Sequence, residues 1–451
     1  MRFSALIELL RCPNCRGELR FAATATPTLG AAEFGTLTCA CGRYPVLDGI
    51  PILLRDRIDS LEHTTNDVEI AGPSVADLLR MLDRGRAMDA LVEALIVPHL
   101  PAIARRLPWR IAHGAALSHV AKARGRRRLY ADVLKRRSAL SLREALNYFY
   151  HPDGPLDADV KHYFALRFGQ PRHLAVLALL AALPSGAAPV LDLACGIGHL
   201  AHYLTGRPRS VPVIGLDVNL FHLWLARHWT CPQAHVVCAN AAMALPFADA
   251  AFSAITCSDA YHYIPNRTQL VSEFRRVAPG MPYVLSRVGN RAVMPNEGDE
   301  RTVEQYAQEL GGTVSVFSEQ ALRRCYLQRA NPFAMDPEAG DALQAAKWLS
   351  FVVNPPVAHD DLGGEPWPHA VGQLCINPIF VPSRQANGDV RLRFDFPTKW
   401  YAYENHDMLS YHPRSARVTA EQLARLHQPG GATALPSLVE QFVVIGAPSR
   451  F

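Results

Sequence analysis

The chain has 451 residues, of which 49% are hydrophobic and 19% are charged, and its formal net charge is +5. This is the composition of a globular protein that is long enough for two or three domains. The longest apolar run, around residues 174–183, is too short for a membrane-spanning helix, which needs about 20 residues, and the N-terminus lacks the apolar core and cleavage site of a signal peptide. We therefore expect a soluble cytoplasmic protein.

Four of the ten cysteines cluster near the N-terminus: Cys12 and Cys15 form a CxxC knuckle, and Cys39 and Cys41 form a CxC pair. Such clustering in a cytosolic chain favours a metal site over disulfides. Four thiolates can close a tetrahedral structural zinc site, which leaves no open position for a substrate. The dipeptide Asp48-Gly49 predicts a turn between two apolar strands.

Residues 1–58 resemble the zinc-ribbon proteins that act as activator subunits of tRNA, rRNA and release-factor methyltransferases. The stretch YPVLDGIPILL is the most specific part of the match. The resemblance implies a zinc-ribbon-like β module. The second knuckle departs from the family because it has one residue fewer than the usual CxxC, and the alternative is a metal-free ribbon held by its apolar strands.

Helical periodicity, interrupted by prolines, follows in residues 75–165. Within this segment, residues 105–137 carry eleven basic residues and one acid, a net charge of +10 (11 − 1), so the rest of the chain sums to −5. A basic run of this kind can track nucleic-acid phosphates. The alternative is a solvated helix face whose Lys and Arg stems cover apolar surface.

Short apolar strands alternate with helices from residue 188 to 290, which predicts a parallel sheet wound with helices. The first unit, VLDLACGIGHLAHYL at 190–204, contains a G-x-G-x-x-A turn, and Asp217 ends the next strand. This spacing fits NAD as well as other adenosine cofactors. Asp192 lies in the first strand, where its carboxylate would repel a pyrophosphate. It suits a ligand with an ammonium group, such as the methionine end of S-adenosylmethionine.

Further motifs follow in order: Asn240 ends a third strand, Asp249 precedes a fourth, and EFRRVAPGMPYVLSRV predicts a helix, a turn and a fifth strand. With the glycine turn, this block resembles the class I S-adenosylmethionine-dependent methyltransferases, in particular the group that includes ubiquinone and menaquinone methyltransferases. The resemblance implies a doubly wound α/β Rossmann-like core over 166–295. It also implies a set of cofactor-binding residues: Asp192, Ala194, Cys195, Gly196, Gly198, Asp217, Asn240 and Ala241.

Two of these positions depart from the family pattern. Ala194 replaces the usual first glycine, and Asn240 stands where an aspartate is more usual. A carboxamide oxygen can still accept a hydrogen bond from the adenine amino group. We therefore expect S-adenosylmethionine binding despite both changes.

Methyl transfer from a sulfonium is an in-line displacement, in which alignment can supply roughly 7–11 kcal/mol of the barrier. A base is needed only if the acceptor must lose a proton. His262 follows the fourth strand, where the ligand crevice of such sheets opens, and is the candidate base; the alternative is a capping or packing histidine. The NPPV stretch at 354–357 resembles the loop of amino-group methyltransferases of nucleic acids, but a proline-stiffened loop is the favoured interpretation.

Residues 296–451 are dense in proline and aromatic residues. We expect them to form an α+β insertion or extension that supplies the acceptor pocket, with 438–448 as the last strand of the methyltransferase sheet. The predicted function is methyl transfer to a small-molecule acceptor, and an anionic or lipid-linked acceptor would fit the arginines of the basic run. An RNA acceptor held by residues 105–137 and a non-catalytic partner-docking module stay open, and a nicotinamide oxidoreductase is the least favoured.

Overall fold

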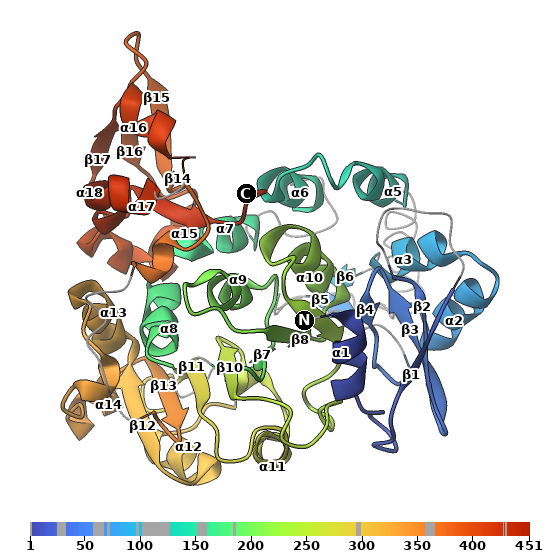
Figure 1. Ribbon diagram of the computed structural model, residues 1–451. Coiled ribbons are helices and arrows are strands. Elements are labelled where there is room, and N and C mark those ends of the chain that lie inside the picture. The colour runs from blue at the N-terminus through green and yellow to red at the C-terminus, as the bar shows by residue number, and fades with distance from the viewer. Residues whose placement is uncertain are drawn as a thin grey trace.

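The computed structural model of the protein describes residues 2–24, 33–56, 73–95, 127–150, 160–183, 186–294, 299–356, 366–426, 428 and 431–451, and the backbone of 67–69 and 99–101. At its centre lies a seven-stranded sheet in the order β12-β13-β11-β10-β7-β8-β9 (Figure 1). Its strands are β7 (Val190–Leu193), β8 (Val213–Asp217), β9 (His235–Cys238), β10 (Ala254–Ser258), β11 (Tyr283–Gly289), β12 (Val314–Ser318) and β13 (Trp348–Val353).

The strands from β9 to β11 are all parallel, and β13 runs antiparallel between β11 and β12. Within this sheet, β7 is the first strand in chain order. The next two strands, β8 and β9, lie on one side of β7, and β10 then pairs with β7 on its other side. The strand order therefore reverses between β7 and β10, and a ligand crevice is expected outside the carboxyl ends of these two strands.

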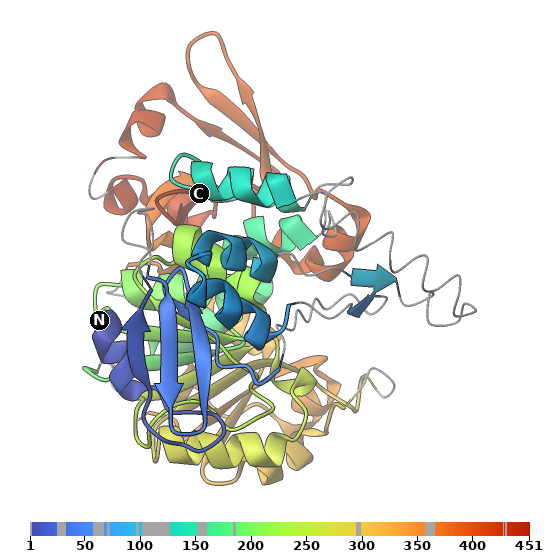
Figure 2. The same cartoon turned by 90° about the vertical axis from the view of Figure 1, so that its right-hand side faces the viewer.

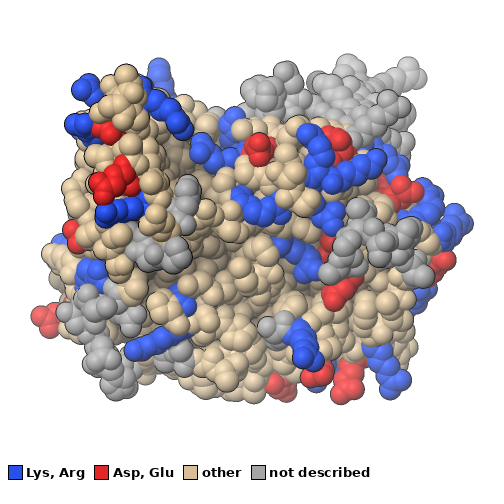
Figure 3. Space-filling model, turned by 45° about the horizontal axis from the view of Figure 1, so that its top comes forward, with Lys and Arg blue, Asp and Glu red and all other residues tan. Residues whose placement is uncertain are grey.

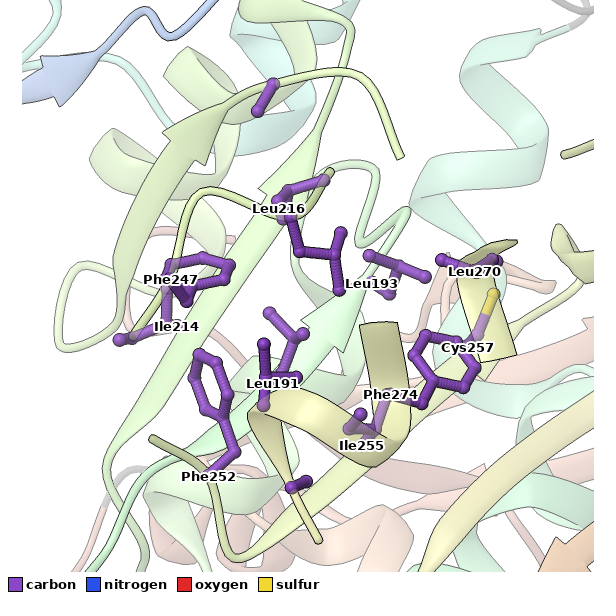
Figure 4. Close-up of a cluster of buried hydrophobic side chains, with 14 of the residues drawn as sticks. Leu191, Leu193, Ile214, Leu216, Phe247, Phe252, Ile255, Cys257, Leu270 and Phe274 are labelled. Carbon is purple, nitrogen blue, oxygen red and sulfur yellow. The ribbon is translucent and has the colours of Figure 1, made fainter. Parts of the chain in front are cut away.

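Both faces of the sheet are covered by helices, which is why its central strands are almost continuously apolar. On one face Leu191, Leu193 and Ile255 pack against Leu270 and Phe274 of α11 (Figure 4). The other face packs against α8, α9 and α13. The helices of this part are α8 (Pro171–Ala181), α9 (His199–Gly206), α10 (Leu220–Leu225) with a π-helical continuation (Ala226–Thr230), α11 (Arg267–Val277), α12 (Val303–Leu310), α13 (Glu319–Gln328) and α14 (Gly340–Ala345).

The N-terminal part is an antiparallel sheet that docks on the β9 edge of the central sheet. Ile52 forms a parallel bridge with Cys238, and the Leu53 N–H donates to the Cys238 carbonyl at 2.8 Å. The β9 edge, which would otherwise expose unpaired backbone groups, is thereby covered. This part comprises α1 (Phe3–Leu9), β1 (Arg20–Ala23), β2 (Gly35–Cys39), β3 (Gly42–Leu47) and β4 (Ile50–Pro51).

Helices α2 and α3 lie beside the four N-terminal strands, which face the viewer in Figure 2. The further elements before the central sheet are β5 (Asp67–Glu69), α2 (Val75–Asp83), α3 (Ala87–Leu95), β6 (His99–Pro101), α5 (Arg127–Arg136), α6 (Leu142–Phe149) and α7 (Val160–Ala165). Of the basic run at 105–137, residues 105–126 lie outside the described residues. Within the part of the chain that the structure describes, no helix combines the length and apolar character needed to cross a bilayer.

The C-terminal part forms two small sheets and several short helices, at the upper left of Figure 1. The strand predicted at 438–448 belongs here: β18 pairs with β14 and not with the central sheet, so that prediction is wrong. The apolar run WLSFVV of β13 completes the central sheet instead, which therefore extends beyond residue 295 to Val353. The elements are β14 (Gln373–Ile376), β15 (Phe380–Arg384), β16 (Val390–Phe394), α15 (Lys399–Glu404), β17 (Ser415–Val418), α16 (Ala420–Arg425), α17 (Gly431–Ala434), α18 (Pro436–Glu440) and β18 (Val444–Ala447).

The Asn-Pro-Pro stretch follows the antiparallel strand β13. Its first residue, Asn354, donates from Nδ2 to the Met281 carbonyl just before β11 begins. It therefore lies at the amino ends of the parallel strands, at the edge opposite the crevice. The interpretation as a stiff loop is consistent with this position.

Candidate functional site

The turn after β7 depends on left-handed backbone at three positions. Ala194, Gly196 and Gly198 have φ values of 53°, 52° and 83°. A Cβ on Gly198 would lie 3.2 Å from the Cβ of Ala226, so glycine allows α9 to start close to the π-helical turn after α10. A Cβ on Gly196 would meet no atom within 4 Å, so open space lies beside this glycine. Ala194 adopts a conformation that costs a non-glycine residue about 1–3 kcal/mol, as is often seen at functional sites.

Asp217, at the end of β8, ties this turn to the next one. Its Oδ2 accepts a hydrogen bond from the Gly196 N–H at 2.8 Å, and its Oδ1 accepts one from the Asn219 N–H at 2.9 Å. These two hydrogen bonds hold the Asp217 carboxylate in place beside the glycine turn.

Asp192, on β7, is buried, and its Oδ2 has no hydrogen-bond partner among the described residues. Burial, followed by the proximity of Asp217, raises the pKa of Asp192 to about 8. The carboxyl group is therefore protonated at neutral pH until a positive charge approaches it. An orphaned carboxylate oxygen below an open glycine turn fits a ligand that carries a cation.

The remaining predicted cofactor residues also lie at the carboxyl ends of the parallel strands. Asn240 follows β9, and its Oδ1 accepts from the Ala242 N–H at 2.8 Å, so one of its two acceptor positions is already used; Ala241 lies between these two residues. Cys195 fills the space over Gly215, where a Cβ would come within 2.8 Å of its Sγ. Burial raises the pKa of Cys195 well above its ordinary value, so its thiol is a packing group and not a thiolate.

Helix α7 lies across this edge and contacts the segments that follow three of the parallel strands. The Phe164 carbonyl accepts from His199 Nε2 at 3.0 Å, and the Phe164 ring lies 5.1 Å from that of His222. The Tyr163 hydroxyl donates to Asp259 Oδ2 at 3.2 Å, after β10. These contacts place α7 as a cover over the carboxyl ends of β7, β8 and β10.

His262, the predicted base, lies in the short 3₁₀ helix after β10, close to the predicted crevice. It is buried, and its ring centroid lies 4.0 Å from that of Tyr263 and 6.0 Å from that of Trp348. These contacts suit a packing histidine as well as a base, so its catalytic role stays a prediction.

A buried group of charged residues lies on the same side, and sequence reasoning missed it. Asp259 accepts from Arg287 at Oδ1 (2.9 Å) and from Arg172 and Arg167 at Oδ2 (3.2 and 3.3 Å). Burial opposes the charge on Asp259, but the three guanidinium groups outweigh it and hold the pKa of Asp259 well below its ordinary value. No spacing rule connects the arginines, because they come from different elements of the fold. The "arginine cluster" is defined as Arg167, Arg172, Arg287, Asp259, Glu319 and Glu404.

Two members of the arginine cluster have strained backbones. Asp259 has a φ of 62° and Arg287 a φ of 54°, and the pairing of β11 with β13 shifts register between Leu285 and Val288. A bulge of this kind re-aims a side chain and is frequent next to active sites. Left-handed backbone costs about 1–3 kcal/mol at each such residue.

The four N-terminal cysteines meet in space as predicted. Their Sγ atoms all lie within 4.8 Å of one another, and three pairs, Cys12–Cys41, Cys39–Cys41 and Cys15–Cys39, are 3.4, 3.5 and 3.8 Å apart. Zn–S bonds of about 2.3 Å in a tetrahedron require S···S distances of about 3.8 Å. The shortened CxC knuckle therefore does not prevent four thiolates from converging, and the group fits a structural zinc ion.

Residues 190–279 match the model of a family described as methyltransferase domain. Among solved structures, a putative methyltransferase from Bacillus halodurans is 20% identical, covering 41% of this chain and 99% of the other, with a TM-score of 0.27. A chain from the complex of the Haloferax volcanii Trm112 methyltransferase activator with a putative methyltransferase is 17% identical, covering 44% and 95%, with a TM-score of 0.32.

The Haemonchus contortus phosphoethanolamine N-methyltransferase 2, in complex with S-adenosyl-L-methionine, is 17% identical, covering 48% of this chain and 60% of the other, with a TM-score of 0.32. A comparison with curated proteins finds no significant match. With the strand order of the central sheet, the family match at residues 190–279 shows that the chain contains a class I S-adenosylmethionine-dependent methyltransferase domain.

Proposed function

We propose that the protein transfers the methyl group of S-adenosylmethionine to a small-molecule acceptor at the carboxyl ends of β7 and β10. The observation that carries the proposal is Asp192 in the strand that leads into the open glycine turn. Its buried Oδ2 has no hydrogen-bond partner among the residues that the structure describes. The Asp192 carboxylate binds the ammonium group of the cofactor. The Asp217 carboxylate accepts hydrogen bonds from the two ribose hydroxyls, and Asn240 and Ala241 border the adenine.

Bound S-adenosylmethionine supplies an electrophilic methyl group, and the residues of this chain align the reactants. Asp192 and Asp217 fix the two ends of the cofactor, and α7 excludes water from the crevice. Alignment of this kind can account for roughly 7–11 kcal/mol of the barrier. His262 takes a proton from an acceptor that must lose one. Kinship with the ubiquinone and menaquinone group is part of the same proposal.

A small molecule is favoured over RNA by the described part of the basic run. Arg127 pairs with Glu93 and Asp89, and Arg136 pairs with Asp132 at 2.7 Å, so these charges are already partly neutralised. On the face shown in Figure 3, basic side chains lie in separate groups with acidic side chains between them. A phosphate-tracking surface needs unpaired cations along one path.

The cysteine group is proposed to hold a structural zinc ion. The Cys12 Sγ lies 3.2 Å from the Tyr44 hydroxyl, and the Asn14 N–H donates to it at 3.4 Å. Such outer hydrogen bonds orient a ligand and stabilise its thiolate form. A closed set of four thiolates leaves no position for substrate, so the zinc would hold the ribbon in shape for docking on β9.

Binding of S-adenosylmethionine, measured by calorimetry, tests the cofactor part of the proposal. We expect Asp217→Ala to weaken binding at least tenfold, because it removes both the ribose acceptors and the anchor of the glycine turn. Asp249→Ala is the matched control, since Asp249 is 80% exposed and pairs only at the surface with Arg276. Equal affinities of the two variants for S-adenosylmethionine would show that Asp217 does not bind the cofactor.

The acceptor class is tested by label transfer from methyl-labelled S-adenosylmethionine to an extract of cells that lack the protein. We expect label in the small-molecule fraction. Label in a fraction that nuclease digestion destroys would identify RNA as the acceptor and assign residues 105–137 to phosphate binding.

A further inference from the structure

The arginine cluster lies beside the proposed cofactor site, and none of its members is among the residues proposed to bind the cofactor. Asp259 follows β10, Arg287 lies on β11, and α7 reaches the cluster through Tyr163. The side chains of Arg167, Arg172 and Arg287 are 5–7% exposed. Two strained residues, Asp259 and Arg287, contact each other within the cluster. This combination of burial, charge and strain next to the crevice points to a binding role.

Glu404 is the member of the cluster that is most easily replaced. It comes from α15 of the C-terminal part, and its side chain is 21% exposed, compared with 14% for Asp259 and 15% for Glu319. Among the described residues, Glu404 makes its hydrogen bonds through Oε2 alone, which accepts from Arg172 at 3.2 Å and from Arg287 at 3.5 Å. Both contacts are longer than the 2.7–2.9 Å typical of charge-assisted hydrogen bonds.

Arg172 has unused binding capacity. Its Nη1 and Nη2 donate to Asp259 and Glu404, but its Nε is buried and has no partner among the described residues. A carboxylate or phosphate usually engages two N–H groups of a guanidinium at once. The contact between Glu404 and Arg172 is therefore incomplete, and another anion can improve on it.

The charge balance also favours replacement of Glu404 by an anion. The cluster has three guanidinium groups and three carboxylates, Asp259, Glu319 and Glu404. If Glu404 withdraws, one positive charge remains without a partner in a buried setting, which one negative charge on a ligand would neutralise.

The helix that carries Glu404 also exposes Trp400 and Tyr403, which are 50% and 77% exposed. Trp400 lies one helical turn before Glu404 and offers an apolar contact next to the charged group.

We propose that the methyl acceptor is a small organic anion whose acidic group, a carboxylate or a phosphate, binds Arg172 and Arg287 in place of Glu404. The inference rests on the proposed function, because it places this anion next to the cofactor. Glu404 occupies the anion position in the free protein, and its withdrawal couples acceptor binding to movement of α15. The apolar body of the acceptor contacts Trp400 and Tyr403.

The test uses the full chain saturated with S-adenosylhomocysteine, at constant ionic strength, with calorimetric titration of three probes: benzoate, inorganic phosphate and neutral benzamide. We expect Glu404→Gln to bind benzoate or phosphate at least tenfold more tightly than the wild type, with no gain for benzamide. The larger gain of the two anions identifies the acidic group. Glu421→Gln is the matched control, since Glu421 forms an exposed ion pair with Arg425 in the same part of the chain.

Equal anion affinity in Glu404→Gln and the wild type, or an equal gain for benzamide, would overturn the proposal and leave the cluster as a clamp between core and C-terminal part. If Glu404→Gln does not fold, Arg172→Lys in the wild-type background tests the proposal instead. Lysine keeps the positive charge but lacks the paired N–H donors with which a guanidinium binds an acidic group. We expect Arg172→Lys to weaken benzoate binding at least tenfold while S-adenosylmethionine affinity is unchanged; unchanged benzoate affinity contradicts the proposal. If the wild-type protein does not bind S-adenosylmethionine, the proposed function itself is wrong.

Discussion

At the scale of single residues, Asp192 carries a conflict between stability and binding. Its carboxyl is buried next to Asp217, and its pKa of about 8 lies far above the value of an unfolded chain. The folded protein holds a proton that the unfolded chain releases above about pH 4, so this group destabilises the fold increasingly from about pH 4 to 8. At neutral pH this cost is of order 2–4 kcal/mol, and a ligand cation can recover part of it.

We therefore expect Asp192→Asn to raise the melting temperature of the free protein and to weaken S-adenosylmethionine binding about 10- to 100-fold, because a charge-assisted hydrogen bond is lost. In the wild type, binding at pH 7 should release close to one proton, and affinity should fall about tenfold per pH unit below pH 8. Calorimetry in buffers of different ionisation enthalpy measures the proton release. Asp249→Asn, at an exposed position, should change neither quantity. Proton release that persists in Asp192→Asn would assign the titration to another group.

At the scale of elements, the ribbon strands depend on the four cysteines at one end and on the β9 edge at the other. The zinc proposal predicts about one zinc ion per chain by elemental mass spectrometry. Cys39→Ser should lose the metal and lower the melting temperature by several degrees, because zinc binding contributes directly to the folding of such modules. Cys375→Ser, a cysteine far from this group in the fold, serves as the control. A full zinc content in Cys39→Ser would show that the four thiolates are not the ligands.

At the scale of the whole molecule, buried histidines make the fold sensitive to acid, and one of them, His369, links the core to the C-terminal part. His369 accepts from the Tyr326 hydroxyl at Nδ1 and donates from Nε2 to the Val439 carbonyl, and so is held neutral. Burial lowers the pKa of His199 and His369 to about 3 and that of His412 to about 4. In the unfolded chain these groups bind protons below about pH 6.5. The stability that these neutral histidines contribute is therefore complete above about pH 6.5 and is lost as the pH falls toward 4.

In urea denaturation, each of these histidines should lower the unfolding free energy by about 2 kcal/mol between pH 7 and pH 5. The opposite trend of Asp192 offsets part of this fall. His369→Gln should reduce that slope, although it also costs stability at pH 7. His406→Gln, at an exposed position, should leave the slope unchanged. An identical slope in His369→Gln and the wild type would exclude His369 as a source of acid sensitivity.

The sequence by itself determined the features that lie close together along the chain or follow one another in a fixed order. Gly196 and Gly198 form the expected turn, Asp217 ends the strand that follows, and Cys12, Cys15, Cys39 and Cys41 converge. Strand-turn-helix units have local causes, namely alternating apolar runs and residues that accept left-handed backbone, and these causes are visible in one dimension.

Only the tertiary structure decided which distant segments meet. The last strand of the central sheet in chain order is β13 and not β18. Both are short apolar runs, so the sequence alone does not show which of them pairs with β11. The tertiary structure docked the ribbon on the β9 edge, and it brought Arg167, Arg172 and Glu404 to Asp259. Residues such as Arg172 and Glu404, which are 232 positions apart, share no periodicity or motif. Their juxtaposition results from the packing of the C-terminal part against α8 and the ends of β10 and β11, which local sequence does not encode.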